Sequence, residues 1–202
     1  MLLFDLAPDD ARLWLRTQFV TNKIGKPIRE PLLSPDQTLV PAAVLVPLVL
    51  REAGVSVLLT RRAEHLVDHP GQISFPGGRC EPSDESDIAT ALREAYEEVG
   101  LSPATVEVLG CLPEYCTATG FRVSPVVGVV SPPLELALDP SEVQEAFEVP
   151  LAFLLNERNH EKHTREVRGV MREYVAMPYG DYFIWGATAG LLITLREFLV
   201  QP

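Results

Sequence analysis

The sequence predicts a mixed α/β fold, and three observations support this prediction. Two β-rich apolar runs, residues 42–50 and 55–60, are joined by the short segment REAG, which is typical of a hairpin. Residues 88–99 repeat apolar side chains at helical spacing. The segment IWGATA, residues 184–189, opens a closing helix that we expect to end near Leu199. Strands and helices therefore mix along one chain, although the pattern does not give the order of the strands.

Length and composition fit one domain with a substantial core. The chain has 202 residues, of which 47% are apolar and 22% charged. No apolar run approaches the ~20 residues of a membrane span. The first six residues, MLLFDL, lack a basic segment and turn acidic at once, so we expect no signal peptide. Cys80, Cys111 and Cys116 are odd in number and lack metal-like spacing, which favours reduced thiols in a cytoplasmic protein.

The net charge of −11 limits the choice of partners. Nucleic acid is not expected, because affinity for it comes mainly from Lys and Arg that neutralise phosphates. No membrane partner is expected either, and the oligomeric state stays open, a homodimer included. A polyanionic small molecule must instead meet local cations. Those near the central motif are Arg61, Arg62, Arg79 and Arg122.

The first part of the chain reads as an extension followed by two strands. An amphipathic helix is expected near residues 9–20, and residues 25–41 are rich in proline and turn residues. We therefore divide the chain into a helix with a connecting arm, residues 1–41, and a main domain, residues 42–202. The two strands are apolar at nearly every position, which predicts burial on both faces. Pro47 lies within the first of them, so we expect a bulge or an edge position there.

The later part of the chain supplies further strands and short helices. His160 and His163 are spaced i, i+3, which does not match the HExxH zinc signature. The remaining expected elements are a short strand at 72–75, strands at 105–112 and 121–130 separated by the small polar segment 116–120, a short helix at 151–155, an exposed loop or hairpin tip at 156–172, and a strand at 174–177.

The helix expected at residues 88–99 has clear ends. Ser86, or Asp84 before it, can accept hydrogen bonds from the free N–H groups at its start. Gly100 is placed to end it as a left-handed cap. The helix follows the turn FPGG, residues 75–78, and paired glycines let backbone groups approach a ligand closely. A glycine turn near a helix N-terminus suits phosphate.

The opposite side of this helix carries three glutamates. Glu94, Glu97 and Glu98 are spaced i, i+3 and i+4, so they lie a turn apart. Like charges at this spacing cost roughly 0.2–0.5 kcal/mol per pair, and Arg93 relieves part of that cost through Glu97. A hard divalent cation would remove the repulsion. A plain solvated acidic face is the alternative, and the preceding glycine turn favours the cation.

The segment REAYEEVGL, residues 93–101, resembles the second half of the Nudix box, GX5EX7REUXEEXGU, where U is aliphatic. Ala95 stands where a larger aliphatic residue is usual. Gly78 lies one residue further from Arg93 than the pattern allows, so Arg79 takes the formal first position, whereas Glu85 keeps the expected distance. Six fixed positions match in register.

Residues 58–78 carry a second resemblance. The segment LLTRRAEHLVDHPGQISFPGG is similar to LLTXRSX3RX3GX3FPGG, which marks the coenzyme A pyrophosphatase branch of Nudix hydrolases. Ala63 replaces the usual serine and Val67 the usual second arginine, and the latter change removes a cation that could hold a phosphate. The segment EVQEAFEVPL, residues 142–151, is also common in Nudix proteins, and IWGATA is similar to a segment of the coenzyme A branch.

The resemblance implies a fold and a reaction. The fold would be the Nudix α/β/α sandwich, a curved mixed sheet between helices, here with an N-terminal helical extension. The reaction would be metal-dependent hydrolysis of the diphosphate bond of coenzyme A or its derivatives to 4′-phosphopantetheine and adenosine 3′,5′-bisphosphate. The alternatives are a pyrophosphatase of another nucleoside diphosphate derivative (ADP-ribose, NADH or a dinucleotide polyphosphate) and a non-catalytic module that senses a nucleotide.

The resemblance also assigns roles around the helix. Glu94, Glu97 and Glu98, with the backbone carbonyl of Gly78, would hold Mg²⁺ or Mn²⁺. Glu94 or Glu97 is expected to act as the general base, with Glu142 as the alternative. Arg93 is expected to pair with Glu85 or Glu97 and turn the acids toward the metal, a contact with the substrate being the alternative.

Substrate contacts are expected on the strand before the motif and at the glycine turn. Arg61 and Arg62 would meet the diphosphate or the 3′-phosphate, unless they pair with Glu64 or Asp68. Gly77 and Gly78 would bring the backbone close to the substrate. Three aromatic residues have two readings each, packing or stacking on a base: Phe75 under the glycine turn, and Tyr115 and Phe121 beside the small polar segment.

Overall fold

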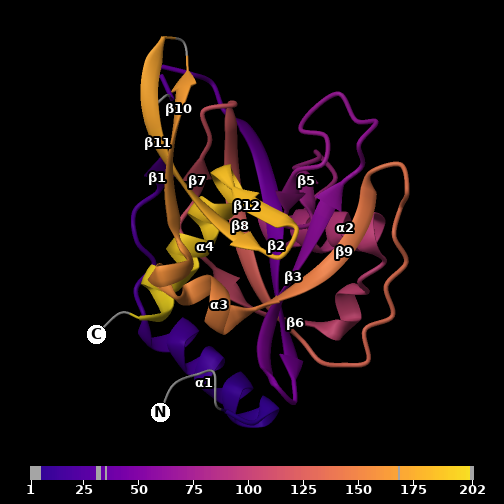
Figure 1. The fold of residues 1–202 in the computed structure, drawn as a ribbon. Helices are drawn as coiled ribbons and strands as arrows, with labels where there is room; N and C mark the ends of the chain where they lie inside the picture. Colours follow the sequence, from indigo (N-terminus) through magenta and orange to yellow (C-terminus); the bar gives the residue numbers. More distant parts are fainter. Residues whose placement is uncertain (1–5, 31–32, 35, 168, 201–202) are drawn as a thin grey trace.

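A computed structural model describes residues 6–30, 33–34, 36–167 and 169–200 (Figure 1). Residues 1–5, on which the expectation about a signal peptide rests, lie outside this part of the chain. The helices and strands form the predicted α/β/α sandwich, with a large mixed sheet between helices. No helix among the described residues is long and apolar enough to cross a membrane.

Two long strands form the centre of the large sheet. Strand β2 (Val40–Arg51) turns through residues 52–53 into β3 (Gly54–Arg62), which confirms the predicted hairpin. On its other side β2 runs parallel to β8 (Phe121–Val130), and β3 pairs antiparallel with β9 (Val143–Pro150). Because β2 and β3 have neighbours on both sides and helices on both faces, their near-continuous apolar sequence is buried.

Short strands complete this sheet, which has nine strands within the described residues. They are β1 (Ile28–Arg29), β4 (Ile73–Ser74), β5 (Gly77–Arg79), β6 (Val106–Cys111) and β7 (Tyr115–Cys116). Strand β1 belongs to the predicted connecting arm and pairs parallel with β7, so the arm lies against the domain at this point.

Pro47 lies inside a central strand, and the pairing explains how the strand accepts it. On the side opposite β8, pairing with β5 ends at Val44 and pairing with β3 begins at Leu48. The N–H of Leu45 points to this side, where it donates to the carbonyl of Pro76, and alternate residues point the same way. The nitrogen of Pro47 therefore faces the gap between two partners, so the predicted edge character holds locally although β2 is not an edge strand.

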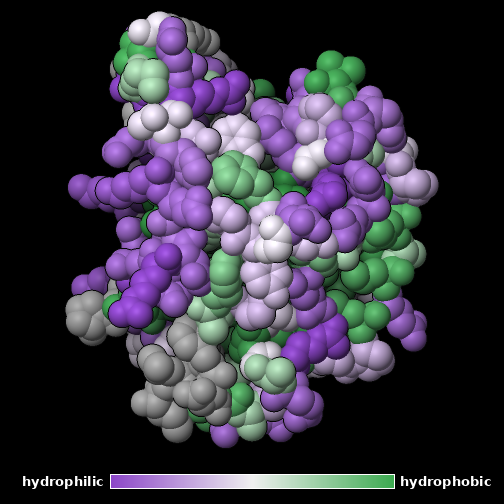
Figure 2. Space-filling model, in the orientation of Figure 1, coloured by the Kyte–Doolittle hydropathy of each residue, from purple (hydrophilic) through white to green (hydrophobic). Residues whose placement is uncertain are grey.

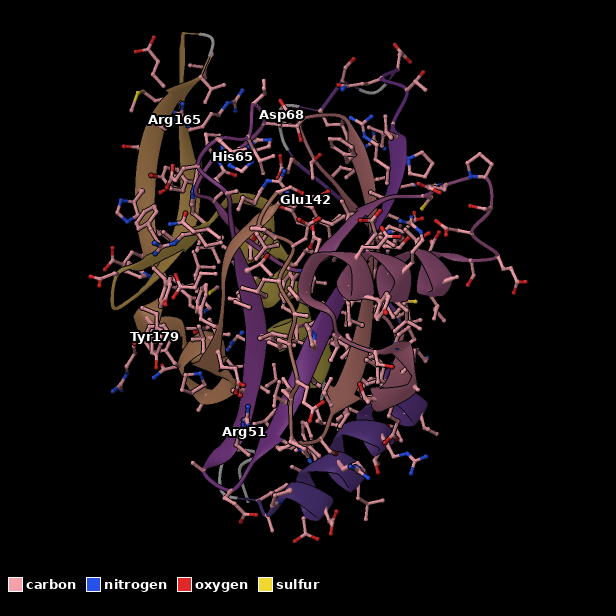
Figure 3. The ribbon with its side chains drawn as sticks, turned by 90° about the vertical axis from the view of Figure 1, so that its right-hand side faces the viewer. Arg51, His65, Asp68, Glu142, Arg165 and Tyr179 are labelled. Atoms are coloured by element: carbon pink, nitrogen blue, oxygen red, sulfur yellow. The ribbon has the colours of Figure 1, made fainter. Side chains whose placement is uncertain are left out.

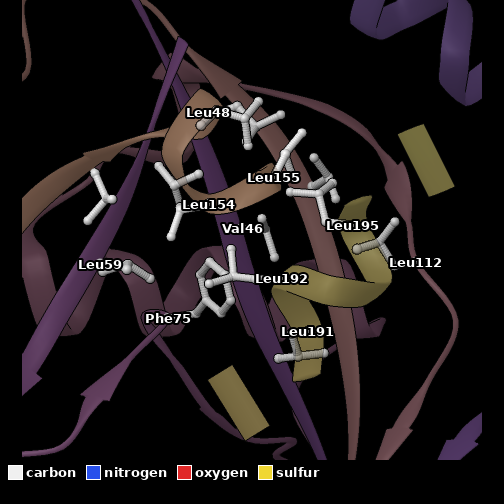
Figure 4. Packing of buried hydrophobic residues seen from close by; sticks show 14 of the residues in the cluster. Val46, Leu48, Leu59, Phe75, Leu112, Leu154, Leu155, Leu191, Leu192 and Leu195 are labelled. Carbon is white, nitrogen blue, oxygen red and sulfur yellow. The ribbon is translucent and has the colours of Figure 1, made fainter. Parts of the chain in front are cut away.

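Helices cover both faces and create two cores. Helix α2 (Asp87–Val99) packs on one face, where Ala43 and Leu45 of β2 meet its apolar side. The other face carries α1 (Pro8–Thr21), α3 (Leu151–Leu155) and α4 (Gly186–Leu199), the first and last near the predicted ranges. The larger core lies there and includes Val46, Leu154 and Leu192 (Figure 4).

A second, smaller sheet extends from the domain. It consists of β10 (Glu161–Val167), β11 (Val170–Tyr179) and β12 (Tyr182–Trp185), all antiparallel. The exposed segment predicted at 156–172 is thus mostly one arm of a hairpin, preceded by a 3-10 turn, Glu157–Asn159. Another 3-10 turn, Pro103–Thr105, follows α2. Mostly hydrophilic side chains cover the side of the molecule where β10 and β11 lie (Figure 2).

Candidate active site

Helix α2 begins and ends where the sequence predicts. The hydroxyl oxygen of Ser86 accepts a hydrogen bond of 3.2 Å from the N–H of Ala89, so Ser86 rather than Asp84 caps the start. Gly100 adopts φ 70° and donates its N–H to the carbonyl of Tyr96. The helix is therefore fixed in length, and its three glutamates have fixed positions along it.

The glycine turn lies directly against the helix. Strand β5 holds Gly77 and Gly78 beside β2. A Cβ on Gly77 would lie 2.5 Å from the carbonyl oxygen of Ala43, and one on Gly78 would lie 2.5 Å from the carboxylate carbon of Glu94. Gly77 needs glycine, because its Cβ would meet backbone atoms, whereas a Cβ on Gly78 would force the carboxylate of Glu94 to move. The missing side chains leave space at the carboxylate of Glu94.

Glu98 is the most buried of the three glutamates, with 5% of its surface exposed. Its carboxylate accepts a hydrogen bond of 3.1 Å from the N–H of Gly77. Burial raises the pKa of Glu98 to about 8, and the charges of Glu142 and Glu94 add to that rise. A carboxylate so placed lacks the counter-charge that would keep it ionised near neutral pH.

Glu94 and Glu97 differ in environment. The side chain of Glu94 is 16% exposed, and burial raises its pKa, partly offset by Arg93. The side chain of Glu97 is 56% exposed. Exposure to solvent therefore increases in the order Glu98, Glu94, Glu97.

Arg93 connects these glutamates to the acidic loop. Its Nη1 atom donates to Glu94 at 2.9 Å and to Glu97 at 3.0 Å, which agrees with one of the two predicted partners. The structure does not show the alternative pairing, with Glu85. Asp84 takes that place, accepting from Nε at 3.0 Å and from Nη2 at 2.9 Å.

Asp84 is a functional candidate that sequence reasoning missed in this role. It also accepts from the hydroxyl of Thr90 at 2.8 Å and from the backbone N–H of Glu81 at 2.9 Å. The hydrogen bonds from Arg93 hold the pKa of Asp84 well below its usual range. Arg93 donates in addition to the carbonyl of Arg79 at 3.2 Å, so one guanidinium joins the loop, the glycine turn and the helix.

Glu142 lies across from the helix. It precedes β9, and in Figure 3 it lies between α2 and the loop that carries His65 and Asp68. Its carbonyl accepts from the N–H of Ala63 at 2.8 Å. The charge of Glu142 adds to the rise in the pKa of Glu94 and of Glu98.

Neither Arg61 nor Arg62 forms an ion pair with Glu64 or Asp68, which was the alternative to a contact with the substrate. Arg61 lies 3.8 Å from the carboxylate of Glu145 and 5.1 Å from the centre of the Tyr182 ring, and so does not pair with Glu64. Arg62 donates to the backbone carbonyl of Asp68 at 3.4 Å, not to its carboxylate. The charge of Arg62 slightly offsets the rise in the pKa of Glu98.

Phe75 corrects a predicted substrate contact. It is 4% exposed and belongs to the larger core, as Leu192 does (Figure 4). A ring buried in this way has no face for adenine, so the packing role is the one that the structure shows. Tyr115 is likewise buried, whereas Phe121 is partly exposed with the guanidinium of Arg79 5.5 Å from its ring centre.

The acidic groups suit a divalent cation in chemistry and in charge. Glu98 is a buried carboxylate and Glu94 a partly buried one; both have raised pKa values, and Gly78 leaves room for the carboxylate of Glu94. Among the described residues, however, no three acidic, His or Cys side chains already converge on one point. Glu97 is turned to Arg93 and Glu98 to Gly77, so side-chain rotations must accompany metal binding.

A glutamate-bearing helix held against a glycine turn, on an α/β/α sandwich, defines a class of hydrolases that work with a divalent metal ion. The family model for the NUDIX domain matches residues 39–173, and the chain belongs to the Nudix family of hydrolases.

Two relatives and one solved structure illustrate the membership. Nudix hydrolase NudL of Enterobacter sp. (strain 638) is 44% identical over 160 residues, covering 79% of this chain and 81% of that protein. NudL of Escherichia coli (strain K12) is 43% identical over the same shares. Both are described as uncharacterized. The NUDIX domain of Shewanella oneidensis NrtR, solved with ADP ribose, superposes with a TM-score of 0.52 at 20% identity, over 83% of this chain and 94% of that one. This likeness supports the fold alone.

Proposed function

We propose that this Nudix hydrolase cleaves the diphosphate bond of coenzyme A or its derivatives, giving 4′-phosphopantetheine and adenosine 3′,5′-bisphosphate, with Mg²⁺ or Mn²⁺ as the metal in the cytoplasm. The observation that carries the reaction is the buried carboxylate of Glu98, held 3.1 Å from the backbone nitrogen of Gly77 in the glycine turn. The choice of coenzyme A rests on the resemblance of residues 58–78 to that branch.

Glu94, Glu97 and Glu98 would hold the metal, with the carbonyl of Gly78 as a further ligand. A bound divalent cation supplies charge neutralisation on the diphosphate and a water of lowered pKa. The cation would supply a positive charge next to Glu94 and Glu98, whose pKa values burial raises. Arg93 positions Glu94 and Glu97, because its own orientation is fixed by two hydrogen bonds to Asp84.

The proton of the attacking water needs an acceptor. Glu94 and Glu97 are the proposed bases, since both are more exposed than Glu98 and share the Nη1 donor of Arg93. Glu142 is the alternative base, because its charge acts on both Glu94 and Glu98.

Arg62 is the proposed contact for the diphosphate. Among the described residues its guanidinium forms no ion pair, and its charge acts on Glu98. Arg61 is partly neutralised by Glu145, so we assign it a smaller part in binding the diphosphate. Gly77 and Gly78 would let a phosphate approach the backbone.

We also propose that residues 42–202 form the catalytic domain and that residues 1–41 pack on it as an extension. Leu15 of α1 is fully buried in the larger core, and β1 pairs with β7. Both contacts favour an extension that stays bound to the domain.

A substrate panel tests the proposed function. Purified protein is incubated with coenzyme A, acetyl-coenzyme A, ADP-ribose, NADH and diadenosine polyphosphates, each with Mg²⁺ or Mn²⁺, and products are separated by chromatography. We expect the coenzyme A compounds to be cleaved most efficiently and adenosine 3′,5′-bisphosphate to appear as product. Turnover of ADP-ribose or NADH without turnover of coenzyme A would reject the proposal, and so would binding without hydrolysis at every metal concentration.

A further inference from the structure

A cavity of about 340 Å³ lies between the smaller sheet and α4, and the roles given above leave it unused. This size lies at the lower end of the range of small-molecule sites. We call it the arginine–aromatic pocket, after five of the residues that line it: Arg165, Arg172, Tyr174, Trp185 and Tyr115.

Two positive charges stand side by side in this pocket. Arg165 of β10 and Arg172 of β11 are direct cross-strand partners. Like charges directly opposite each other destabilise a sheet. Neither guanidinium forms an ion pair within the part of the chain that the structure describes, and the Nε atom of Arg172 is buried without a hydrogen-bond partner there. An anion in the pocket would relieve this repulsion.

The two carboxylates at the pocket do not supply that anion. Glu173 follows Arg172 in β11, so its side chain projects to the opposite face of the sheet. Glu30 lies on the wall formed by Tyr115 and Ala118, where it accepts a hydrogen bond of 2.7 Å from the N–H of Ala118 and forms no ion pair with either arginine. Within the described residues, neither carboxylate is thus an ion-pair partner of Arg165 or Arg172, and an external anion can take that place.

Aromatic rings adjoin the arginines. The ring centres of Tyr174 and Trp185 are 5.4 Å apart, and the guanidinium of Arg165 lies 5.9 Å from the centre of the Trp185 ring. Flat aromatic and guanidinium groups are surfaces on which a nucleic base stacks. A planar base with an attached phosphate matches both features of the pocket, whereas an uncharged, flexible chain would use only its apolar wall.

An element that lines the pocket is hydrogen-bonded to the strand that precedes the glycine turn. Trp185 also lines a second cavity, which Arg61 and Gly71 share. One turn into α4, the hydroxyl of Thr188 donates a hydrogen bond of 2.8 Å to the carbonyl of Ile73 in β4. Strand β4 leads directly into the FPGG turn. Helix α4, which forms one wall of the pocket, is thus hydrogen-bonded to the strand that precedes the glycine turn.

We propose that the arginine–aromatic pocket binds the phosphorylated adenosine end of the substrate. The adenine packs against Trp185 and Tyr174, and Arg165 and Arg172 bind the 3′-phosphate. This inference rests on the proposed function for the identity of the substrate. Beyond the proposed function, the pocket would be a specificity site, which distinguishes nucleotides that carry a 3′-phosphate from those that lack one.

Binding without turnover tests the pocket directly. The chain has two tryptophans, so the Trp14→Phe variant leaves Trp185 as the only tryptophan fluorophore. We expect adenosine 3′,5′-bisphosphate, added without metal, to quench this fluorescence saturably. Its dissociation constant should rise about 10-fold or more in an added Arg165→Gln/Arg172→Gln pair, as expected for lost hydrogen bonds to a charged group. AMP, which lacks the 3′-phosphate, should bind more weakly and respond little to the pair.

Controls guard against an indirect effect. Arg158→Gln removes an exposed arginine outside the pocket and should leave the bisphosphate affinity unchanged. Calorimetric titration of the wild-type chain and of the double variant repeats the comparison without the Trp14 change. Equal affinity for the bisphosphate in wild type and double variant, or equal affinity of the wild type for AMP and the bisphosphate, would overturn the proposal.

Kinetics separate this proposal from the proposed function. Arg172→Gln should raise KM for coenzyme A about 10-fold and leave KM for 3′-dephospho-coenzyme A and both kcat values nearly unchanged. Equal changes for the two substrates would overturn the assignment of the 3′-phosphate. Failure of the wild type to cleave coenzyme A would reject the proposed function alone, because the titration needs no turnover.

Discussion

The backbone N–H of Gly77 donates a hydrogen bond of 3.1 Å to the buried carboxylate of Glu98. This bond joins the glycine turn to the last turns of α2, two segments that are 21 residues apart in the chain. Strand β5 is held in the sheet by its pairing with β2, so the sheet itself fixes the position of this carboxylate. The acidic side of the helix is thus partly an interior surface, unlike the solvated face that its composition allows.

Replacing Glu98 by glutamine tests the ligand assignment. The amide keeps an oxygen that can accept from Gly77 but loses the negative charge. We expect turnover to fall more than about 100-fold, as for a metal ligand next to the reaction. Far-UV circular dichroism should show an intact fold. Glu52→Gln, in the exposed turn between β2 and β3, is the matched control and should keep full activity. Near-normal turnover of the Glu98 variant would contradict the assignment.

Glu98 should also make the stability of the metal-free protein depend on pH. Its pKa is about 8 in the folded chain and about 4.5 when unfolded. Between these values the folded state binds more protons, so stability is full below pH 4.5 and falls as pH rises toward 8, by at most about 1.4 kcal/mol per pH unit. Melting curves in EDTA from pH 5 to 9 should show this fall. The fall should be much smaller in the Glu98→Gln variant. Parallel curves for the two proteins would show that Glu98 titrates normally.

Asp84→Asn tests the orientation of Arg93. The change removes the charge that two guanidinium nitrogens bind at 2.9 and 3.0 Å. We expect a lower melting temperature and a turnover reduced about 10- to 100-fold, as for groups that orient metal ligands. Glu85→Gln is the control at the neighbouring position and should have little effect on either. The reverse order of the two effects would restore Glu85 as the partner of Arg93.

Gly78→Ala tests the close approach of the glycine turn to the helix. The added Cβ would lie 2.5 Å from the carboxylate carbon of Glu94, so that carboxylate must move. A displacement of about 1 Å costs on the order of 100-fold in turnover. Gly25→Ala, where the nearest atom would be an ordinary 3.4 Å away, should leave kcat unchanged. Crystals or kinetics that show Glu94 and kcat unaltered in Gly78→Ala would remove the role assigned to this glycine.

The elements that local sequence determines were predictable. The apolar spacing of residues 88–99, the hydroxyl of Ser86 and the missing side chain of Gly100 set the ends of α2 without help from the rest of the chain. The parallel pairing of β2 with β8 was not predictable, because it joins segments about 80 residues apart through backbone bonds that any sequence can make. The strand β10 was missed for a different reason. It projects from the domain with both faces largely exposed, so it lacks apolar alternation.

In the candidate site too, the features set by local sequence were predictable and those set by tertiary structure were not. Helical spacing alone places Glu94, Glu97 and Glu98 on one side. It cannot say which carboxylate of a loop reaches Arg93, because Asp84 and Glu85 are adjacent and only the backbone path of the loop selects Asp84. Phe75 was ambiguous because an aromatic residue beside a glycine turn suits both a base and a core. Its burial follows from the direction in which the end of β4 faces, which is a tertiary property.

Glu142→Gln decides between the proposed bases. The charge of Glu142 contributes to the raised pKa of both Glu94 and Glu98. If Glu94 or Glu97 takes the proton, the variant should keep turnover within about 10-fold, whereas loss of a general base costs about 10²- to 10⁴-fold. Removing a negative neighbour lowers the pKa of the remaining carboxylates. The acid limb of kcat/KM against pH should therefore move to lower pH, while Glu97→Gln or Glu94→Gln should lower the whole profile. A loss above about 100-fold in Glu142→Gln together with disappearance of the acid limb would assign the base to Glu142.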